Sequence, residues 1–298
     1  MNRAKLHGML ALCAATALGS ANAAAQAVRA QGPLAESNGL ASGPCLRARS
    51  SPRAPIELSF GIPGVAALSD FGSTPSACGF SGFSIGGRMG LLVATSAFYG
   101  AIDAEASLSG TYRIDDDSWI TLGFDAVRYR TVINASVVTA PVDFGATTLT
   151  VHHVIATDDE AQVTLFLRAL LPTELSNRYA ARLGVEPGFS VAYSPHRRWT
   201  LHGGISIPVS AAVSAAGTHF TFTPRASLDV AWLPIDPFEL LLGLEARAGL
   251  DGLEYLSPRL GLRVHATRRL FIDLSAMAPL LGLERTLARA SLTAGMRW

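Results

Sequence analysis

Apolar and polar side chains alternate along the C-terminal part of the chain, from His219 to Trp298. Within residues 219–232, one set of alternate positions is apolar and the other is polar. The apolar set is Phe220, Phe222, Ala226, Leu228, Val230 and Trp232, and the polar set is His219, Thr221, Thr223, Arg225, Ser227 and Asp229. A period of two residues is that of a β-strand whose two faces meet different surroundings. The pattern therefore predicts an all-β fold with one apolar and one polar face.

The hydropathy of the whole chain indicates what covers the apolar face. With 49% hydrophobic and 16% charged residues and a mean hydropathy of +0.30, the chain is more apolar than most soluble proteins. Beyond the N-terminus, however, no run reaches the roughly 18 to 20 apolar residues that a spanning helix needs. Because backbone polar groups in lipid must be paired within the protein, a closed transmembrane barrel fits this pattern. A soluble β-sandwich is the alternative, and it would need a second sheet over every apolar face.

The N-terminus has the composition of a secretory signal peptide. Arg3 and Lys5 precede an apolar stretch over residues 9–18, and small residues over 21–25 offer cleavage sites. We therefore expect residues 1–25 to be a signal peptide and the mature chain to be exported.

Residues 26–80 differ in composition from the rest of the chain. Ser, Gly, Pro and Ala are dense there, and regular alternation is absent except over residues 56–60. We expect an irregular segment, which is either a loosely ordered leader or a plug that folds into the barrel mouth. Its two cysteines, Cys45 and Cys78, are expected to form a disulfide in an oxidising compartment, and two unpaired thiols are the alternative.

Short polar or proline-containing turns recur along the remaining chain, centred near residues 116, 158, 196, 235 and 268. Each interval has room for two strands of roughly ten residues and one longer loop, as in outer-membrane barrels. The spacing predicts an antiparallel up-and-down β-barrel of twelve strands over residues 81–298, with ten and fourteen strands as alternatives. The expected strands are 83–94, 101–113, 118–131, 146–156, 161–171, 184–194, 198–210, 219–232, 238–250, 255–266, 269–279 and 286–298.

Tryptophans mark several expected strand ends. Trp199 and Trp232 each flank a short turn, and Trp298 ends the last strand. Aromatic rings with a polar group prefer the headgroup level, so these residues predict an interfacial girdle. Trp119 also flanks a turn, but its register is that of the polar face, which either a bulge or a tryptophan inside the barrel would explain.

A final strand that ends on an aromatic residue resembles the assembly signal of bacterial outer-membrane β-barrels. The resemblance is to this porin-like superfamily as a whole, covers residues 83–298, and names no family within it. It implies a place in the outer membrane of a Gram-negative bacterium and contact with outer-membrane lipid. It also implies recognition of the C-terminal strand by the barrel-assembly machinery.

The polar positions of successive strands are expected to line the lumen. They include acids and arginines in similar numbers, which either pair into a rigid network or line opposite sides of a narrow channel. The candidate lumen-lining residues are Asp103, Glu105, Arg113, Asp125, Arg168, Arg225, Asp229, Glu245, Arg247, Arg259, Arg263 and Asp273.

Motifs for chemistry are weak in this chain. Residues 82–86 match the G-x-S-x-G pattern around Ser84, but the pattern requires a strand-to-helix turn and no helix is expected to follow. His152 and His153 are adjacent, so on a strand they point to opposite faces and cannot both bind one metal ion without a bulge. His219 and His265 are each followed two residues later by Thr, whereas barrel lipases and lipid A deacylases place Ser there. We expect no catalytic residue, metal or cofactor.

The expected function is a channel or passive uptake protein for a small solute with a charged, narrow lumen. A net charge of +1 leaves no broad basic field for nucleic acid. The alternatives are a barrel-embedded hydrolase acting on lipid or peptide, and a structural or adhesion barrel. An enzyme would need a nucleophile, or carboxylates with a histidine, near the rim that carries the long loops.

Overall fold

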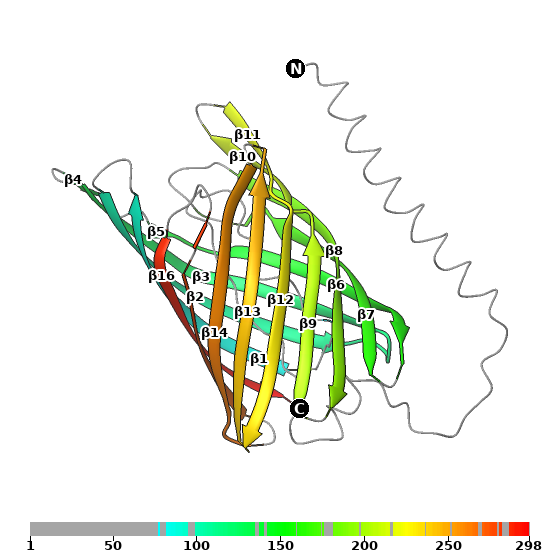
Figure 1. The fold of residues 1–298 in the computed structure, drawn as a ribbon. Coiled ribbons are helices and arrows are strands. Elements are labelled where there is room, and N and C mark those ends of the chain that lie inside the picture. Colours follow the sequence, from blue (N-terminus) through cyan, green and yellow to red (C-terminus); the bar gives the residue numbers. More distant parts are fainter. Residues whose placement is uncertain are drawn as a thin grey trace, which may run out of the picture. The chain divides into compact units, whose positions relative to one another are not determined.

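The computed structural model describes Ala77 and most of residues 82–297 (Figure 1). The exceptions within that range are 95–98, 135–136, 140–141, 159, 174, 176–180, 197, 215–216, 236, 251, 268–269, 279 and 282–285. The predicted signal peptide, Cys45, Cys78, Trp298 and all of segment 26–80 except Ala77 lie outside the described residues.

The regular elements among the described residues are all β-strands, and no helix there is long and apolar enough to cross a membrane. The strands of the first half are β1 (Gly82–Ala94), β2 (Tyr99–Arg113), β3 (Ser118–Asn134), β4 (Val137–Thr139), β5 (Val142–Asp143), β6 (Ala146–Thr157), β7 (Ala161–Leu171) and β8 (Ala181–His196). Those of the second half are β9 (Trp199–Ser206), β10 (Val209–Ser214), β11 (Gly217–Phe222), β12 (Arg225–Ile235), β13 (Phe238–Gly249), β14 (Gly252–His265), β15 (Leu270–Met277) and β16 (Thr286–Arg297).

Twelve of these strands form a closed ring, and β10 and β11 add a further pair of strands beside β8. The order is β1, β2, β3, β6, β7, β8, β9, β12, β13, β14, β15 and β16, and every pairing is antiparallel. β16 pairs with β1, which returns the ladder to its beginning. The fold is therefore the predicted up-and-down β-barrel of twelve strands.

The five predicted short turns connect β2 to β3, β6 to β7, β8 to β9, β12 to β13 and β14 to β15. Aspartates hold two of them. The Asp117 N–H donates to Asp115 Oδ1 at 2.8 Å, and the Glu160 and Ala161 N–H groups donate to Asp158 Oδ1 at 2.8 and 2.6 Å. The hydrogen bond from Asp117 lowers the pKa of the exposed Asp115 carboxyl.

Prolines divide two of the predicted strands. The predicted strand 198–210 is β9 and β10, separated at Pro208, and 219–232 is β11 and β12, separated at Pro224. Proline has no N–H for the ladder, so a break at these residues is compatible with their chemistry, whereas Pro187 and Pro258 lie within the continuous strands β8 and β14. The Thr223 N–H donates to the Pro208 carbonyl at 3.1 Å, so the two breaks lie side by side. The short strands β4 and β5, which pair with β3, were not predicted.

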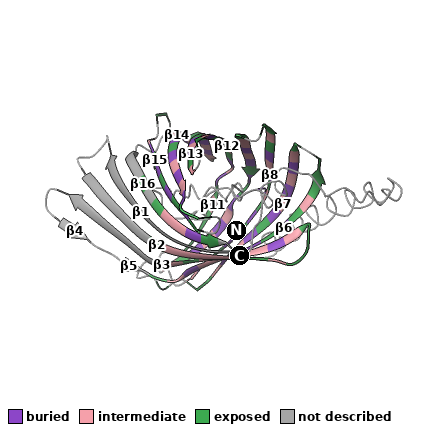
Figure 2. Ribbon diagram, turned by 90° about the horizontal axis from the view of Figure 1, so that it is seen from below, coloured by how far each residue is buried: buried purple, intermediate pink, exposed green. Residues whose placement is uncertain are grey.

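The two faces of the barrel have opposite chemistry. Burial alternates along β7 and β8 (Figure 2): the inward positions are buried and mostly polar, with Phe166 and Leu170 as apolar exceptions, and the outward apolar side chains are exposed or half-buried. Leu167, Leu228, Leu242 and Leu260 are 52 to 58% exposed on the outer face, whereas Glu186 is 0% exposed on the inner face. This is the inverse of a water-soluble protein, and it is the arrangement that a lipid surround stabilises.

The tryptophans occupy two different environments. Trp199 and Trp232 are paired in register near the short turns, exposed on the outer face and stacked with ring centroids 5.4 Å apart. Trp119 is buried and paired in register with the buried His152. Of the two explanations for Trp119, the structure therefore shows the tryptophan inside the barrel.

Candidate functional site

A buried carboxylate on β8 contacts arginines from two other strands. Arg168 Nη1 of β7 lies 3.3 Å from Glu186 Oε2, and Arg225 of β12 donates through Nε to Glu186 Oε1 at 3.0 Å and through Nη2 to the same oxygen. Arg225 Nε also lies 3.0 Å from Ser206 Oγ, and Arg168 Nε donates to Thr150 Oγ1 at 3.2 Å. Glu186 thus links the inner faces of β7 and β12 across β9.

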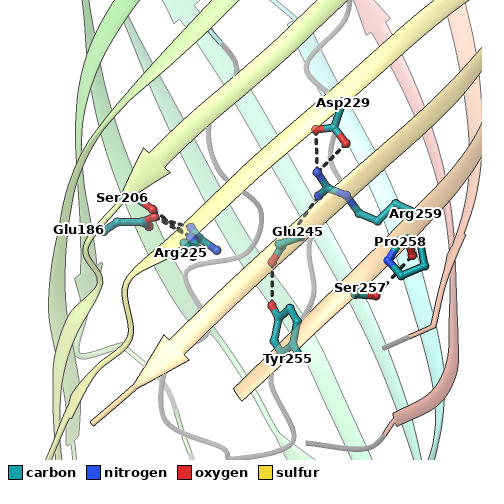
Figure 3. A network of polar contacts seen from close by, with 9 residues as sticks. All are labelled: Glu186, Ser206, Arg225, Asp229, Glu245, Tyr255, Ser257, Pro258 and Arg259. Carbon is teal, nitrogen blue, oxygen red and sulfur yellow. Dashed lines mark hydrogen bonds and ion pairs between the residues drawn. The ribbon is translucent and has the colours of Figure 1, made fainter. Parts of the chain in front are cut away.

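A second group centres on Arg259 of β14 (Figure 3). Its Nη2 donates to both oxygens of Asp229 at 2.6 Å, and its Nη1 donates to Glu245 Oε2 at 2.8 Å. The Tyr255 hydroxyl donates to the other Glu245 oxygen at 2.7 Å. One guanidinium therefore bridges carboxylates on β12 and β13, which is the geometry that arginine favours.

Gly243 makes this bridge possible. It lies on β13 in register between Asp229 and Arg259, so the ion pair must pass over it. A Cβ atom at Gly243 would lie 1.8 Å from Asp229 Oδ1 and 3.2 Å from Arg259 Nε. The missing side chain is therefore a packing requirement of the network, not a requirement for unusual backbone torsions.

We expect Gly243→Ala to disrupt the Arg259–Asp229 pair and to destabilise the barrel, because the new methyl group occupies the position of a carboxylate oxygen. Gly203→Ala is the matched control, since a Cβ there would meet its nearest atom at 3.7 Å. Urea titration of the refolded protein, followed by tryptophan fluorescence, measures both changes. Equal unfolding midpoints for the two variants would contradict the interpretation.

A third group surrounds Arg263, which is fully buried. Its Nη2 donates to Asp273 Oδ2 of β15 at 2.6 Å, and its Nη1 lies 3.4 Å from Glu239 Oε2 of β13. His265 Nε2 lies 3.1 Å from the same Glu239 oxygen, and Phe271 places its ring 5.7 Å from the guanidinium carbon. Arg263 therefore has one carboxylate on each neighbouring strand.

Arg247 of β13 belongs to a fourth charged group on the inner face. Its Nε lies 2.5 Å from Glu254 Oε2, and its guanidinium carbon lies 6.0 Å from the centroid of the Tyr255 ring. The ion pairs therefore extend from β7 through β15, and we call the residues that form them the ion-pair wall. Its members are Arg168, Glu186, Arg225, Asp229, Glu239, Glu245, Arg247, Glu254, Arg259, Arg263 and Asp273.

Eight of the twelve candidate lumen-lining residues lie buried in these groups: Arg168, Arg225, Asp229, Glu245, Arg247, Arg259, Arg263 and Asp273. Arg113 lies instead beside a short turn, with Nη2 3.3 Å from Asp116 Oδ1, and Asp125 is half-buried on β3. The side chains of Asp103 and Glu105 are outside the described set, and their backbone register places them opposite Arg130 and Arg128.

The inner face of β2, β3 and β6 carries hydroxyl groups instead. Thr111, Thr121 and Thr150 are in register across the three strands, and the Thr111 and Thr121 hydroxyl oxygens lie 3.0 Å apart. Thr150 is followed in the same row by Arg168 and Glu186, so this face adjoins the ion-pair wall. The hydroxyl wall consists of Ser107, Ser109, Thr111, Thr121, Thr148 and Thr150.

An aromatic group on the inner face was not recognised from the sequence. Trp119 and His152 stack with ring centroids 4.8 Å apart, and Phe166 lies 6.2 Å from the His152 ring. The Phe166 ring covers Gly188, where a Cβ would lie 2.4 Å from Phe166 Cζ. Continuing the alternation of β6 and β7 toward the short turn would have placed these rings together.

The weaker motifs have ordinary structural positions. Ser84 lies within β1, so the turn that a nucleophile elbow requires is absent from this segment. His152 is buried, whereas His153 is exposed and lies 3.1 Å from Ser118 Oγ, which confirms that the adjacent histidines point to opposite faces. Within the described part of the chain, no cluster of three or more His, Cys, Asp or Glu residues could hold a metal ion.

Comparison with known proteins shows similarity at the level of structure alone. No protein-family model matches the chain, and no curated protein matches its sequence. The structure is similar to an outer-membrane channel from Pseudomonas putida F1, with a TM-score of 0.56 and 12% identity over 77% of this chain and 98% of that one.

Two further similarities have lower TM-scores. The KdgM porin in complex with disordered oligogalacturonate gives 0.46 and 8% identity over 72% of this chain and 99% of that one. The translocator domain of the autotransporter NalP from Neisseria meningitidis gives 0.48 and 11% identity, over 77% and 90%. The ring of strands, its apolar exterior and the match to the Pseudomonas channel agree that this chain has the fold of a porin-like outer-membrane β-barrel.

Proposed function

We propose that the protein is a passive channel or uptake protein for a small polar solute in the outer membrane of a Gram-negative bacterium. The observation that carries the proposal is the polar inner face, which extends over the ion-pair and hydroxyl walls inside an apolar exterior. A polar interior within a lipid-facing barrel is typical of channels. The similarity to the Pseudomonas outer-membrane channel supports the same function.

The position of the carboxylate–histidine pair favours a channel over a hydrolase. Glu239 is the second residue of β13 and His265 is the last of β14, so both lie beside short turns. Glu239 also faces Arg263 at 3.4 Å, which stabilises its anionic form as a structural partner. An enzyme acting at the outer surface would need this pair at the opposite rim.

We further propose that part of segment 26–80 occupies the lumen near the short turns. Ala77 is its one described residue and is 1% exposed. The Ala77 carbonyl accepts hydrogen bonds from Gln162 Nε2 at 2.6 Å and from Thr164 Oγ1 at 2.7 Å. Both donors lie on the inner face of β7, four strands around the ring from β1. Ala77, which precedes β1 in the sequence, therefore contacts the inner face of β7.

The partner proposals follow the same fold. Outer-membrane lipid would cover the exposed apolar face, and the barrel-assembly machinery would recognise β16. This strand forms the junction of the ring with β1, so its pairing is the step that completes the barrel.

Planar-bilayer recording of the refolded mature protein tests the channel function directly. We expect discrete single-channel steps, because the inner face provides a polar path between the two rims. A correctly folded preparation, identified by a band on SDS gels whose mobility changes on boiling, serves as the reference. Folded protein that produces no steps, with or without residues 26–76, would rule out a channel.

The contact at Ala77 gives a separate prediction. Gln162→Leu combined with Thr164→Val removes both hydrogen-bond donors, so we expect the anchored segment to be released and the conductance of the full chain to rise. Val163→Thr changes the opposite face of the same strand and should leave conductance unchanged. If the double variant conducts like the unmodified protein, the segment does not restrict the lumen at this contact.

A further inference from the structure

The distribution of charge on the inner face bears on which solutes pass. We infer that the lumen favours neutral, hydroxyl-bearing solutes over ions of either sign. This inference rests on the proposed channel function and names its substrate class.

Within the ion-pair wall, the negative charges are balanced by arginines close to them. Glu186, Asp229, Glu239, Glu245 and Asp273 each lie 3.4 Å or less from an arginine nitrogen. Ion-selective channels instead present rings of like charge to the permeating ion. Paired charges also have a field that decays faster than that of single charges, so this wall attracts neither cations nor anions strongly.

The hydroxyl wall presents different chemistry to the lumen. Ser107, Ser109, Thr111, Thr121 and Thr148 are half-buried, whereas the ion-pair residues are almost all buried. Water and solute therefore reach the hydroxyl groups more readily than the charges. A hydroxyl group both donates and accepts hydrogen bonds, as do the hydroxyl groups of polyols and sugars, and carries no charge to select ions.

The backbone register places residues of opposite charge on neighbouring strands beyond the ion-pair wall. Glu105 of β2 lies in register between Arg88 of β1 and Arg128 of β3. The hydroxyl wall itself is bounded by Arg113 toward the short turn and by Asp125 farther along β3, one charge of each sign. Residues of both signs therefore occupy neighbouring backbone positions on β1, β2 and β3 as well.

The first test measures selectivity of the full mature chain. In planar bilayers with a KCl gradient, we expect a K⁺ to Cl⁻ permeability ratio close to the mobility ratio of the free ions. In liposome swelling, we expect neutral xylitol to enter faster than xylonate, which has the same carbon chain and one negative charge. A strong preference for either ion, or faster entry of xylonate, would overturn the inference.

Charge variants test whether compensation is the cause. Glu186→Gln removes one negative charge beside Arg168 and Arg225, and arginines stay protonated, so the permeability ratio should shift toward Cl⁻. Glu186→Gln with Arg225→Gln restores the net charge and should restore the ratio. Glu160→Gln, the same substitution at an exposed turn, is the matched control and should have little effect.

The outcomes separate this inference from the proposed function. A folded protein that conducts with strong ion selectivity, or an unchanged ratio in Glu186→Gln, contradicts the inference and leaves the channel function intact. A folded protein that neither conducts nor supports swelling contradicts the channel function itself. The inference and the channel function are both supported if the K⁺ to Cl⁻ permeability ratio of the unmodified protein is close to the mobility ratio, shifts toward Cl⁻ in Glu186→Gln and returns to its original value in the double variant.

Discussion

Replacing Arg263 with methionine is expected to lower the free energy of unfolding by about 3 to 5 kcal/mol, the usual cost of removing one partner of a buried ion pair. Arg263 is 0% exposed and contacts Asp273 and Glu239 on its two neighbouring strands. Methionine fills a similar volume without a charge, so Asp273 loses its arginine partner. Glu239 keeps His265, so the main cost arises at Asp273.

Two further variants identify the origin of this effect. Arg263→Met combined with Asp273→Leu removes the uncompensated carboxylate and should recover much of the lost stability. Arg198→Met at an exposed turn is the control for loss of an arginine. Urea unfolding of each refolded variant provides the measurement. A single variant as stable as the Arg198 control would show that Arg263 does not stabilise the wall.

The second large effect is expected on the opposite face. Leu242→Arg should cost about 2 to 4 kcal/mol, because a charge near the middle of a lipid-facing strand must leave water. Leu242 is 57% exposed on β13, between the buried inner residues Leu241 and Glu245. Ile235→Arg is matched in exposure but lies at the short-turn end of β12, where the same charge should cost about 0 to 1 kcal/mol.

Comparison of the two variants in lipid vesicles tests the placement of the membrane. Unfolding midpoints in urea give the free-energy differences, and wild-type protein refolded in the same lipid is the reference. Equal destabilisation at Leu242 and Ile235 would be incompatible with a lipid boundary that lies between the strand centre and the turn.

The outline of the barrel was predictable because its physical causes are local. Alternation and the polar turns at 116, 158, 196, 235 and 268 predicted twelve strands, and the bounds of most strands agree within three residues. The interruptions at Pro208 and Pro224 were not predictable from proline alone, since Pro187 and Pro258 lie within the continuous strands β8 and β14.

The partners inside the barrel were not predictable in the same way. Alternation places Arg259 and Asp229 on one face, but it does not reveal that Gly243 lies between them and lets the pair cross a strand. That arrangement depends on the pairing register of three strands. Trp119 shows the same limit, because alternation placed it on the polar face but only the pairing of β3 with β6 puts it against His152.

The positions of the ion pairs along the strands have a consequence for assembly. A slip of one residue in the pairing of neighbouring strands turns apolar side chains inward. A slip of two residues keeps every side chain on its own face, so burial of apolar surface does not disfavour that register. Loss of the ion pairs does disfavour it. Arg168 faces Glu186 in the native register, and a slip of two residues would place it opposite Gly184 or Gly188. Arg263, native partner of Asp273, would face Phe271 or Ser275. The paired charges therefore favour the native register over registers shifted by two residues, in which the outer face is equally apolar.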